Sequence, residues 1–136
     1  MKKSIFILFL LLFSANISAQ NKHENIALEN DTIFHFAEVP PEFPGGISEM
    51  MRFIIEHLRI PSIYRISLPF GRVIVRFVVE RDGSLTNIEV VRGVSPRLDA
   101  EAVRVVELMP KWTPGKQNGK PVRVRFTLPI MIRLSV

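Results

Sequence analysis

Few residues of this sequence have the types and spacings that chemistry at a single site requires. The three histidines, His23, His35 and His57, lie far apart and lack the short spacings of metal ligands. No serine, histidine and acid form a recognisable nucleophile arrangement, and there is neither a glycine-rich phosphate loop nor a cysteine. We therefore expect no catalytic residue, no metal and no cofactor, and we predict that the protein is not an enzyme.

The feature best suited to recognition of a partner is the backbone of one long predicted strand. Apolar and polar residues alternate from Val122 to Leu134, so a strand here has one apolar face and one mostly polar face. The apolar positions are Val122, Val124, Phe126, Leu128, Ile130, Ile132 and Leu134. A long strand placed last in the sequence can easily form a sheet edge, and an exposed edge is a template for another chain's backbone.

Pro129 lies inside this strand and cannot donate a ladder hydrogen bond, which favours an edge position. We expect an added strand to pair before this proline, along Arg123, Val124, Arg125, Phe126, Thr127 and Leu128. The main alternative is an edge closed by a second copy in a homodimer. The outward positions carry arginines that form either a solvated face of alternating charge or a basic face for an acidic partner. They are Arg72, Arg76, Arg123, Arg125 and Arg133.

The rest of the domain predicts the elements that position this strand. A helix is expected from Gly46 to Leu58, with one apolar stripe formed by Ile47, Met50, Met51, Ile54 and Leu58. Two strands, 71–80 and 85–91, flank Asp82-Gly83, a strong hairpin signal, with a bulge expected near the turn. Ser95-Pro96 starts a second helix whose buried stripe is Leu98, Ala102, Val105, Val106 and Met109.

The order of these elements is helix, strand, strand, helix, strand. It predicts an α+β fold, in which two helices cover one face of a three-stranded antiparallel sheet. We place the last strand beside the first, with its other side free. Two acidic residues, Asp99 and Glu101, are expected to stabilise the start of the second helix by complementing its dipole.

The N-terminal segment predicts export. Lys2 and Lys3 precede the apolar run 5–13 and a small-residue stretch, as in a signal peptide over residues 1–20, with a short uncleaved anchor as the alternative. Residues 21–38 are expected to be a tether, with Thr32 to Ala37 as a candidate short strand, and 39–136 the folded domain. We predict a periplasmic location, or an inner-membrane anchor facing the periplasm. The net charge of +5 does not indicate nucleic acid as a partner, because the basic residues are scattered and few aromatics are available for base stacking.

Four segments in this order and spacing resemble the TonB C-terminal domain family, in the short form typical of Bacteroidetes sequences. They are Pro41 to Gly46, Gly71 to Leu85, Leu98 to Ala102, and Pro110 to Val122, within a resemblance that covers about residues 38–134. Within these segments we expect a structural role for the following motif residues: Pro44, Gly45, Gly46, Asp82, Gly83, Trp112, Pro114 and Gly115. We interpret Trp112 as a packing anchor for the Pro-Gly turns, with partner recognition as the alternative.

The resemblance implies a domain that binds the N-terminal TonB-box segment of outer-membrane transporters by strand addition along the last strand. It also implies coupling to ExbB and ExbD in the inner membrane. Three features depart from the family pattern: the short leader, the absence of a long proline-rich spacer, and Ile60-Pro61 where many members have Tyr-Pro. Residues 21–40 span at most roughly 70 Å fully extended. The alternative function is therefore a periplasmic interaction module, or an edge-paired homodimer, without energy transduction.

Overall fold

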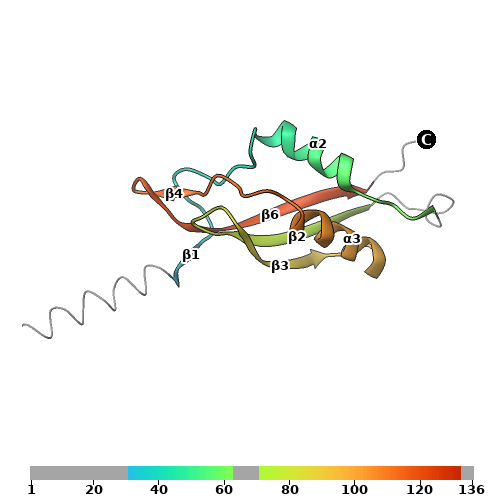
Figure 1. The fold of residues 1–136 in the computed structure, drawn as a ribbon. Coiled ribbons are helices and arrows are strands. Elements are labelled where there is room, and N and C mark those ends of the chain that lie inside the picture. The colour runs from blue at the N-terminus through green and yellow to red at the C-terminus, as the bar shows by residue number, and fades with distance from the viewer. Residues whose placement is uncertain (1–30, 63–70, 133–136) are drawn as a thin grey trace, which may run out of the picture. The chain divides into compact units, whose positions relative to one another are not determined.

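The structure is a computed structural model that describes residues 31–62 and 71–132 (Figure 1). The predicted signal peptide and most of the predicted tether lie outside the described residues. One compact unit begins at Ile33 and contains the sheet and both predicted helices. Its elements are β1 (Ile33–Phe34), α2 (Ile47–His57), β2 (Gly71–Val79), β3 (Leu85–Arg92), α3 (Pro96–Glu107), β4 (Lys116–Gln117), β5 (Lys120–Pro121) and β6 (Arg123–Ile132).

The sheet confirms the predicted α+β class. Its strand order is β1-β6-β2-β3, so the last long strand pairs with the first, as the sequence predicted. Both of these central pairings, β6 with β2 and β2 with β3, are antiparallel. Strand β1 lies within Thr32 to Ala37, where the sequence indicated a candidate short strand, but its pairing with β6 was not predicted. The turn at Asn118 and Gly119 was predicted, but not the separate hairpin of β4 and β5 that it closes.

Strand β1 corrects the prediction that the last strand has one free side. Ile33 and Phe34 pair in parallel with Arg123 and Val124, so the side of β6 away from β2 is not free along its whole length. Residues 33–38 lie in the compact unit that begins at Ile33. β1 pairs here because an unpaired strand edge offers backbone hydrogen bonds to an extended apolar segment. Further along the chain, the Glu38 N–H donates to Gln117 Oε1 at 3.0 Å.

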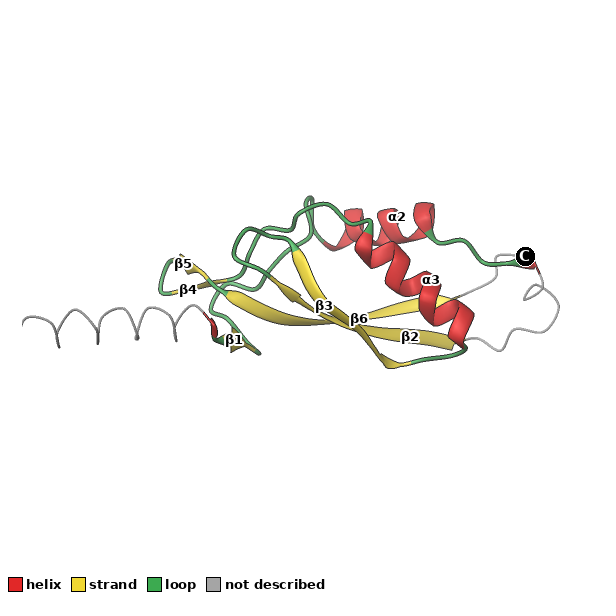
Figure 2. Cartoon of the chain, turned by 60° about the horizontal axis from the view of Figure 1, so that its bottom comes forward, coloured by secondary structure: helices red, strands yellow, loops and turns green. Residues whose placement is uncertain are grey.

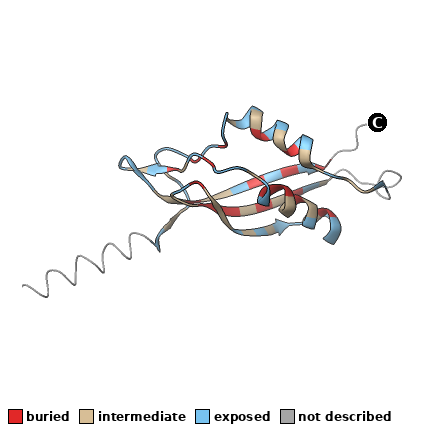
Figure 3. Ribbon diagram, viewed as in Figure 1, coloured by how far each residue is buried: buried red, intermediate tan, exposed pale blue. Residues whose placement is uncertain are grey.

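Both helices lie on the same face of the sheet, which we call the inner face (Figure 2). The core between them and the sheet is formed by apolar residues at alternate strand positions, as Figure 3 shows along β2 and β6. The buried strand residues on this face are Val73, Val75, Phe77, Val79, Val124, Leu128, Ile130 and Ile132. This arrangement matches the predicted alternation, except that Val78, which the sequence placed on the other face of β2, is also buried.

Helix α3 begins where the sequence predicted it. Ser95 accepts a hydrogen bond from the Leu98 N–H at 3.3 Å, and proline occupies the start of the helix. Asp99 Oδ1 accepts from the Val94 N–H at 2.8 Å. Four of the five predicted stripe residues, Leu98, Ala102, Val105 and Val106, are buried, and Met109 is partly buried against the core.

Helix α2 does not bury its whole predicted stripe. Met50 and Ile54 are buried and Leu58 is partly buried, but Ile47 and Met51 are exposed. At about 100° per residue, Met50 and Ile54 lie on one side of the predicted stripe and Met51 on the other, so the helix packs on the sheet through the Met50 side of that stripe.

Candidate functional site

The open edge of β6 is the feature that the sequence singled out. β6 pairs with β2 through nine consecutive residue pairs, from Gly71 opposite Ile132 to Val79 opposite Val124, without a register shift. On the other side, β1 covers only Arg123 and Val124. Among the residues that the structure describes, no strand pairs with this side of β6 from Arg125 to Ile132.

The opposite edge of the sheet, β3, is a poorer template. Its pairing with β2 is shifted at two places, between Ile74 and Val75 and between Arg76 and Val78. Asn87 lies in the second of these shifts and adopts a left-handed conformation at φ 50°, as expected for the bulge that the sequence predicted near the turn. Bulges twist an edge away from an incoming strand, whereas β6 is regular.

The six predicted partner-binding residues divide between the two faces of β6. Val124 and Leu128 are buried on the inner face, where Phe126 is partly buried. Arg123, Arg125 and Thr127 lie on the other face, which we call the outer face. An added strand would meet these residues through its backbone, and its side chains would lie beside both faces.

Arg123 is held by an ion pair at the end of β2. Its Nε and Nη2 donate to the two carboxylate oxygens of Glu80 at 2.8 and 3.0 Å, and Thr86 Oγ1 donates to Glu80 Oε1 at 2.6 Å. The hydrogen bond from Arg123 is the main cause that lowers the pKa of Glu80, opposed by partial burial. This contact joins the starts of β3 and β6 to the end of β2.

Pro129 lies opposite Ile74 in the β2–β6 ladder, which continues through it without a shift. A proline is tolerated on an edge strand when its nitrogen faces away from the pairing strand. We therefore expect Arg125, Thr127 and Met131, which have the same parity, to direct their N–H and C=O groups to the open edge. An added strand would lose one donor at Pro129.

The predicted structural-motif residues lie in the hairpin turn after β2, in the loop before α2 and in the segment after α3. The Trp112 N–H donates to the Gly83 carbonyl at 2.8 Å, so the hairpin turn and the segment after α3 are joined backbone to backbone. Asp82 Oδ1 accepts from the Ser84 N–H and Oγ at 3.0 and 2.6 Å, which lowers the pKa of Asp82. The Asp82-Gly83 turn is therefore fixed both by its own side-chain hydrogen bonds and by the backbone of Trp112.

The other motif positions shape the loops that lead into α2 and β6. Gly45 and Gly46 have φ of 86° and 85°, and Gly46 caps α2 after the exposed Pro44. Gly115 is buried against Val124, and a Cβ there would meet the Val124 Cγ2 at 2.7 Å. Pro114 is half-buried beside it. None of these residues lies on β6 itself.

Trp112 is buried at the centre of an aromatic cluster. Its ring meets Phe43, Phe77 and Phe126 edge-on, at centroid distances of 5.9, 5.4 and 5.0 Å. The indole Nε1 has no hydrogen-bond acceptor among the described residues. Trp112 therefore lies in the core and offers no surface to a partner.

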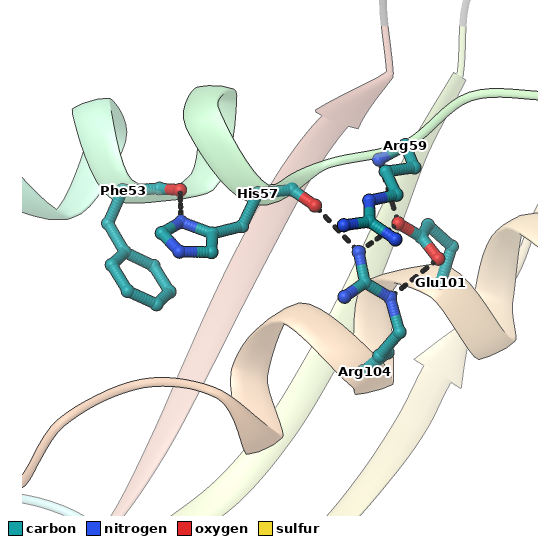
Figure 4. A network of polar contacts seen from close by, with 5 residues as sticks. All are labelled: Phe53, His57, Arg59, Glu101 and Arg104. Atoms are coloured by element: carbon teal, nitrogen blue, oxygen red, sulfur yellow. Dashed lines mark hydrogen bonds and ion pairs between the residues drawn. The ribbon is translucent and has the colours of Figure 1, made fainter.

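A polar network between the two helices was missed by the sequence reasoning (Figure 4). Arg104 Nη2 donates to the His57 carbonyl at 2.6 Å, and Nε and Nη2 donate to Glu101 at 2.9 and 2.6 Å. The Arg59 N–H donates to Glu101 Oε1 at 2.7 Å. Glu101 thus joins α3 to the end of α2 and does not serve the helix start, because it lies in the second turn of α3. The hydrogen bond from Arg104 is the main cause that lowers the pKa of Glu101.

Residues 31–62 and 71–132 contain no group of three or more side chains that could hold a metal ion. In the same part of the chain, no helix is both long enough and apolar enough to cross a bilayer.

Comparison with known proteins supports the family that the sequence resembles. The model of the family described as Gram-negative bacterial TonB protein C-terminal matches residues 61–134. No curated protein matches the chain. Among solved structures, the chain is similar to two solution structures of the Helicobacter pylori TonB C-terminal domain.

The structure of residues 179–285 of that protein has 25% identity and a TM-score of 0.47, and the match covers 68% of this chain and 88% of the other. The structure of residues 194–285 has 26% identity and a TM-score of 0.48, with 63% and 90% covered. Because the family model spans more than half of the sequence, this chain belongs to the TonB C-terminal domain family, whose members are non-enzymatic domains for protein interaction and energy transduction.

Proposed function

We propose that this protein binds N-terminal segments of outer-membrane TonB-dependent transporters in the periplasm, by strand addition along the open edge of β6. The observation that carries the proposal is the contrast between the two sheet edges. β6 presents an unbulged strand that is unpaired from Arg125 among the described residues, whereas β3 is interrupted by register shifts. Regular edges bind extended peptides through backbone hydrogen bonds.

Strand β1 supports the same proposal from within the chain. Ile33 and Phe34 lie as a short parallel strand against Arg123 and Val124, so this edge accepts an extended apolar segment. The sequence predicted pairing along Arg123 to Leu128. With β1 in place, we shift the proposed pairing to Arg125 to Met131, across Pro129, and a longer segment would have to displace β1.

Titration of the exported protein with peptides from the N-termini of transporters encoded in the same genome tests this proposal. We expect backbone amide shifts that concentrate on Arg125 to Met131 and spare β3. Shifts confined to β3, or none at millimolar peptide, would reject strand addition at β6.

Energy transduction through ExbB and ExbD is a separate proposal, because it requires a membrane anchor in addition to the edge. Mass spectrometry of the N-terminus of the protein recovered from cells distinguishes the two cases. A terminus near Ala19 to Asn21 would favour an interaction module without an anchor of its own, whereas an intact leader would favour anchored transduction.

A further inference from the structure

Helix α2 exposes a row of apolar side chains that the core does not use. Ile47, Met51 and Ile55 are 73%, 44% and 74% exposed. They are spaced four residues apart, so they lie along one side of the helix. We call these three residues the α2 shoulder.

The α2 shoulder lies on the side of the helix that faces away from α3. Phe53 and His57 project from α2 toward α3, where their rings stack at 3.9 Å between centroids (Figure 4). The buried residues Met50 and Ile54 face the sheet. At about 100° per residue, the α2 shoulder falls on the other side of this buried stripe from Phe53 and His57.

That side of α2 is the side of the open edge. α3 packs on β2 and β3, and α2 covers the β6 side of the same face (Figure 1). Since the strand order is β1-β6-β2-β3, a side chain on α2 that points away from α3 points past β6. A strand added along β6 would therefore have its inner-face side chains next to the α2 shoulder.

The spacing of the α2 shoulder matches that of a strand. Four helical residues advance about 6.0 Å, and two residues of a parallel strand advance about 6.6 Å. In Figure 1, α2 and β6 run in the same direction. Three successive inner-face side chains of an added strand can thus each meet one residue of the α2 shoulder.

The outer face favours a negative charge on the same strand. Arg76 and Arg123 are paired with Glu89 and Glu80. Arg125 and Arg72, by contrast, form no ion pair within the described part of the chain. A second copy pairing through β6 would bring another Arg125 to this face, whereas an acidic peptide would neutralise it.

We propose that the α2 shoulder and the open edge of β6 form one recognition surface for an extended segment with apolar side chains at three alternate positions. These side chains face α2, and an acidic side chain on the other face lies near Arg125. This inference rests on the proposed function, and it specifies which side chains of the bound segment are preferred. The backbone of β6 binds many sequences, and the α2 shoulder gives selectivity among them.

The test uses two seven-residue peptides, one with valine at three alternate positions and a glutamate between two of them, and one with serine in place of each valine. The protein variants are Met51→Gln and Ile55→Gln, which keep a good helix former on α2. Leu108→Gln is the matched control, because Leu108 is also exposed and apolar but lies at the end of α3. Fluorescence anisotropy gives each Kd, and amide shifts on β6 report whether the edge is used.

We expect the serine peptide to bind about tenfold or more weakly than the valine peptide to the unaltered protein, since apolar burial is lost at three positions. Met51→Gln and Ile55→Gln should each weaken the valine peptide by about 3- to 10-fold and leave the serine peptide unchanged. Leu108→Gln should change neither. Shifts on β6 with equal Kd for both peptides, or with no effect of the α2 variants, would overturn the inference and leave strand addition intact.

Two further outcomes separate the causes of failure. Absence of β6 shifts with these peptides and with transporter segments would reject the proposed function itself. Light scattering that shows a dimer of the unaltered protein, lost in Met51→Gln, would overturn the inference because a second copy would then be the occupant.

Discussion

The contact between Gly83 and Trp112 predicts the largest stability effect of a single added methyl group. Gly83 has φ of 85°, and a Cβ built there would lie 2.0 Å from the Trp112 carbonyl oxygen. The clashing atoms belong to the backbone, so no side chain can move aside. We expect Gly83→Ala to separate the hairpin turn from the Trp112 segment and to break the 2.8 Å hydrogen bond between them.

The expected loss in free energy of unfolding for Gly83→Ala has two contributions. Left-handed backbone costs an alanine about 1–2 kcal/mol, and the lost hydrogen bond costs about 1 kcal/mol more, before any loosening of the aromatic cluster. The free energy of unfolding should therefore fall by about 2–3 kcal/mol, and by more where the aromatic cluster loosens. Gly119→Ala is the matched control, because Gly119 has φ of 73° and no atom within 4 Å of the added Cβ. It should cost only about 1 kcal/mol.

Urea denaturation of both variants measures this difference, provided that the m-value stays constant. Gly83→Ala should be less stable than Gly119→Ala by about 1–2 kcal/mol. Equal losses would show that left-handed strain alone explains Gly83 and that its contact with Trp112 contributes nothing.

Three other changes test separate parts of the structure. Glu80→Gln should lower the urea midpoint at pH 7, and this difference should shrink as the pH falls below 4.5. The pKa of Glu80 is lowered in the folded state, so its stabilisation is present above 4.5 and is lost as the pH falls through the folded pKa. A difference that persists undiminished at pH 3 would contradict the role of the charge. Phe34→Asp should speed hydrogen exchange at Arg123 to Arg125 and leave Ile130 to Ile132 unchanged, because it releases β1; unchanged exchange at Arg123 to Arg125 would show that β1 does not protect this edge. Pro129→Val should strengthen peptide binding about 2- to 10-fold in anisotropy titrations, because it adds one donor to the open edge; unchanged affinity would place that nitrogen on the β2 side.

The long strands and α3 could be predicted from the sequence because local patterns alone specify them. The alternation through Val124, Leu128 and Ile130 has a period of two, and Ser95-Pro96 starts a helix by its own chemistry. In each case the residues that carry the signal lie within one element. The strand order followed from the hairpin at Asp82-Gly83 and from the need to cover one apolar face.

The remaining features depend on contacts between distant segments. Strand β1 has only two residues, so its pairing with Arg123 and Val124 leaves no periodic pattern in the sequence. The exposure of Ile47 and Met51 depends on how far the sheet extends beneath α2. The apolar character of these residues does not indicate that extent. Glu101 could not be linked to Arg59 because 42 residues separate them.

Site-specific disulfide formation tests the central proposal, strand addition at β6, most directly. The chain has no cysteine, so Thr127→Cys places a single thiol on the open edge. Directly opposed residues on paired strands fall within the Cα separation that a disulfide allows. A transporter N-terminal peptide with one cysteine, moved along its sequence, should crosslink to Thr127→Cys strongly at one position and weakly at its neighbours. The same peptides should crosslink little to Asn87→Cys on β3. Equal yields at β3 and β6, or no register preference at Thr127→Cys, would contradict strand addition along this edge.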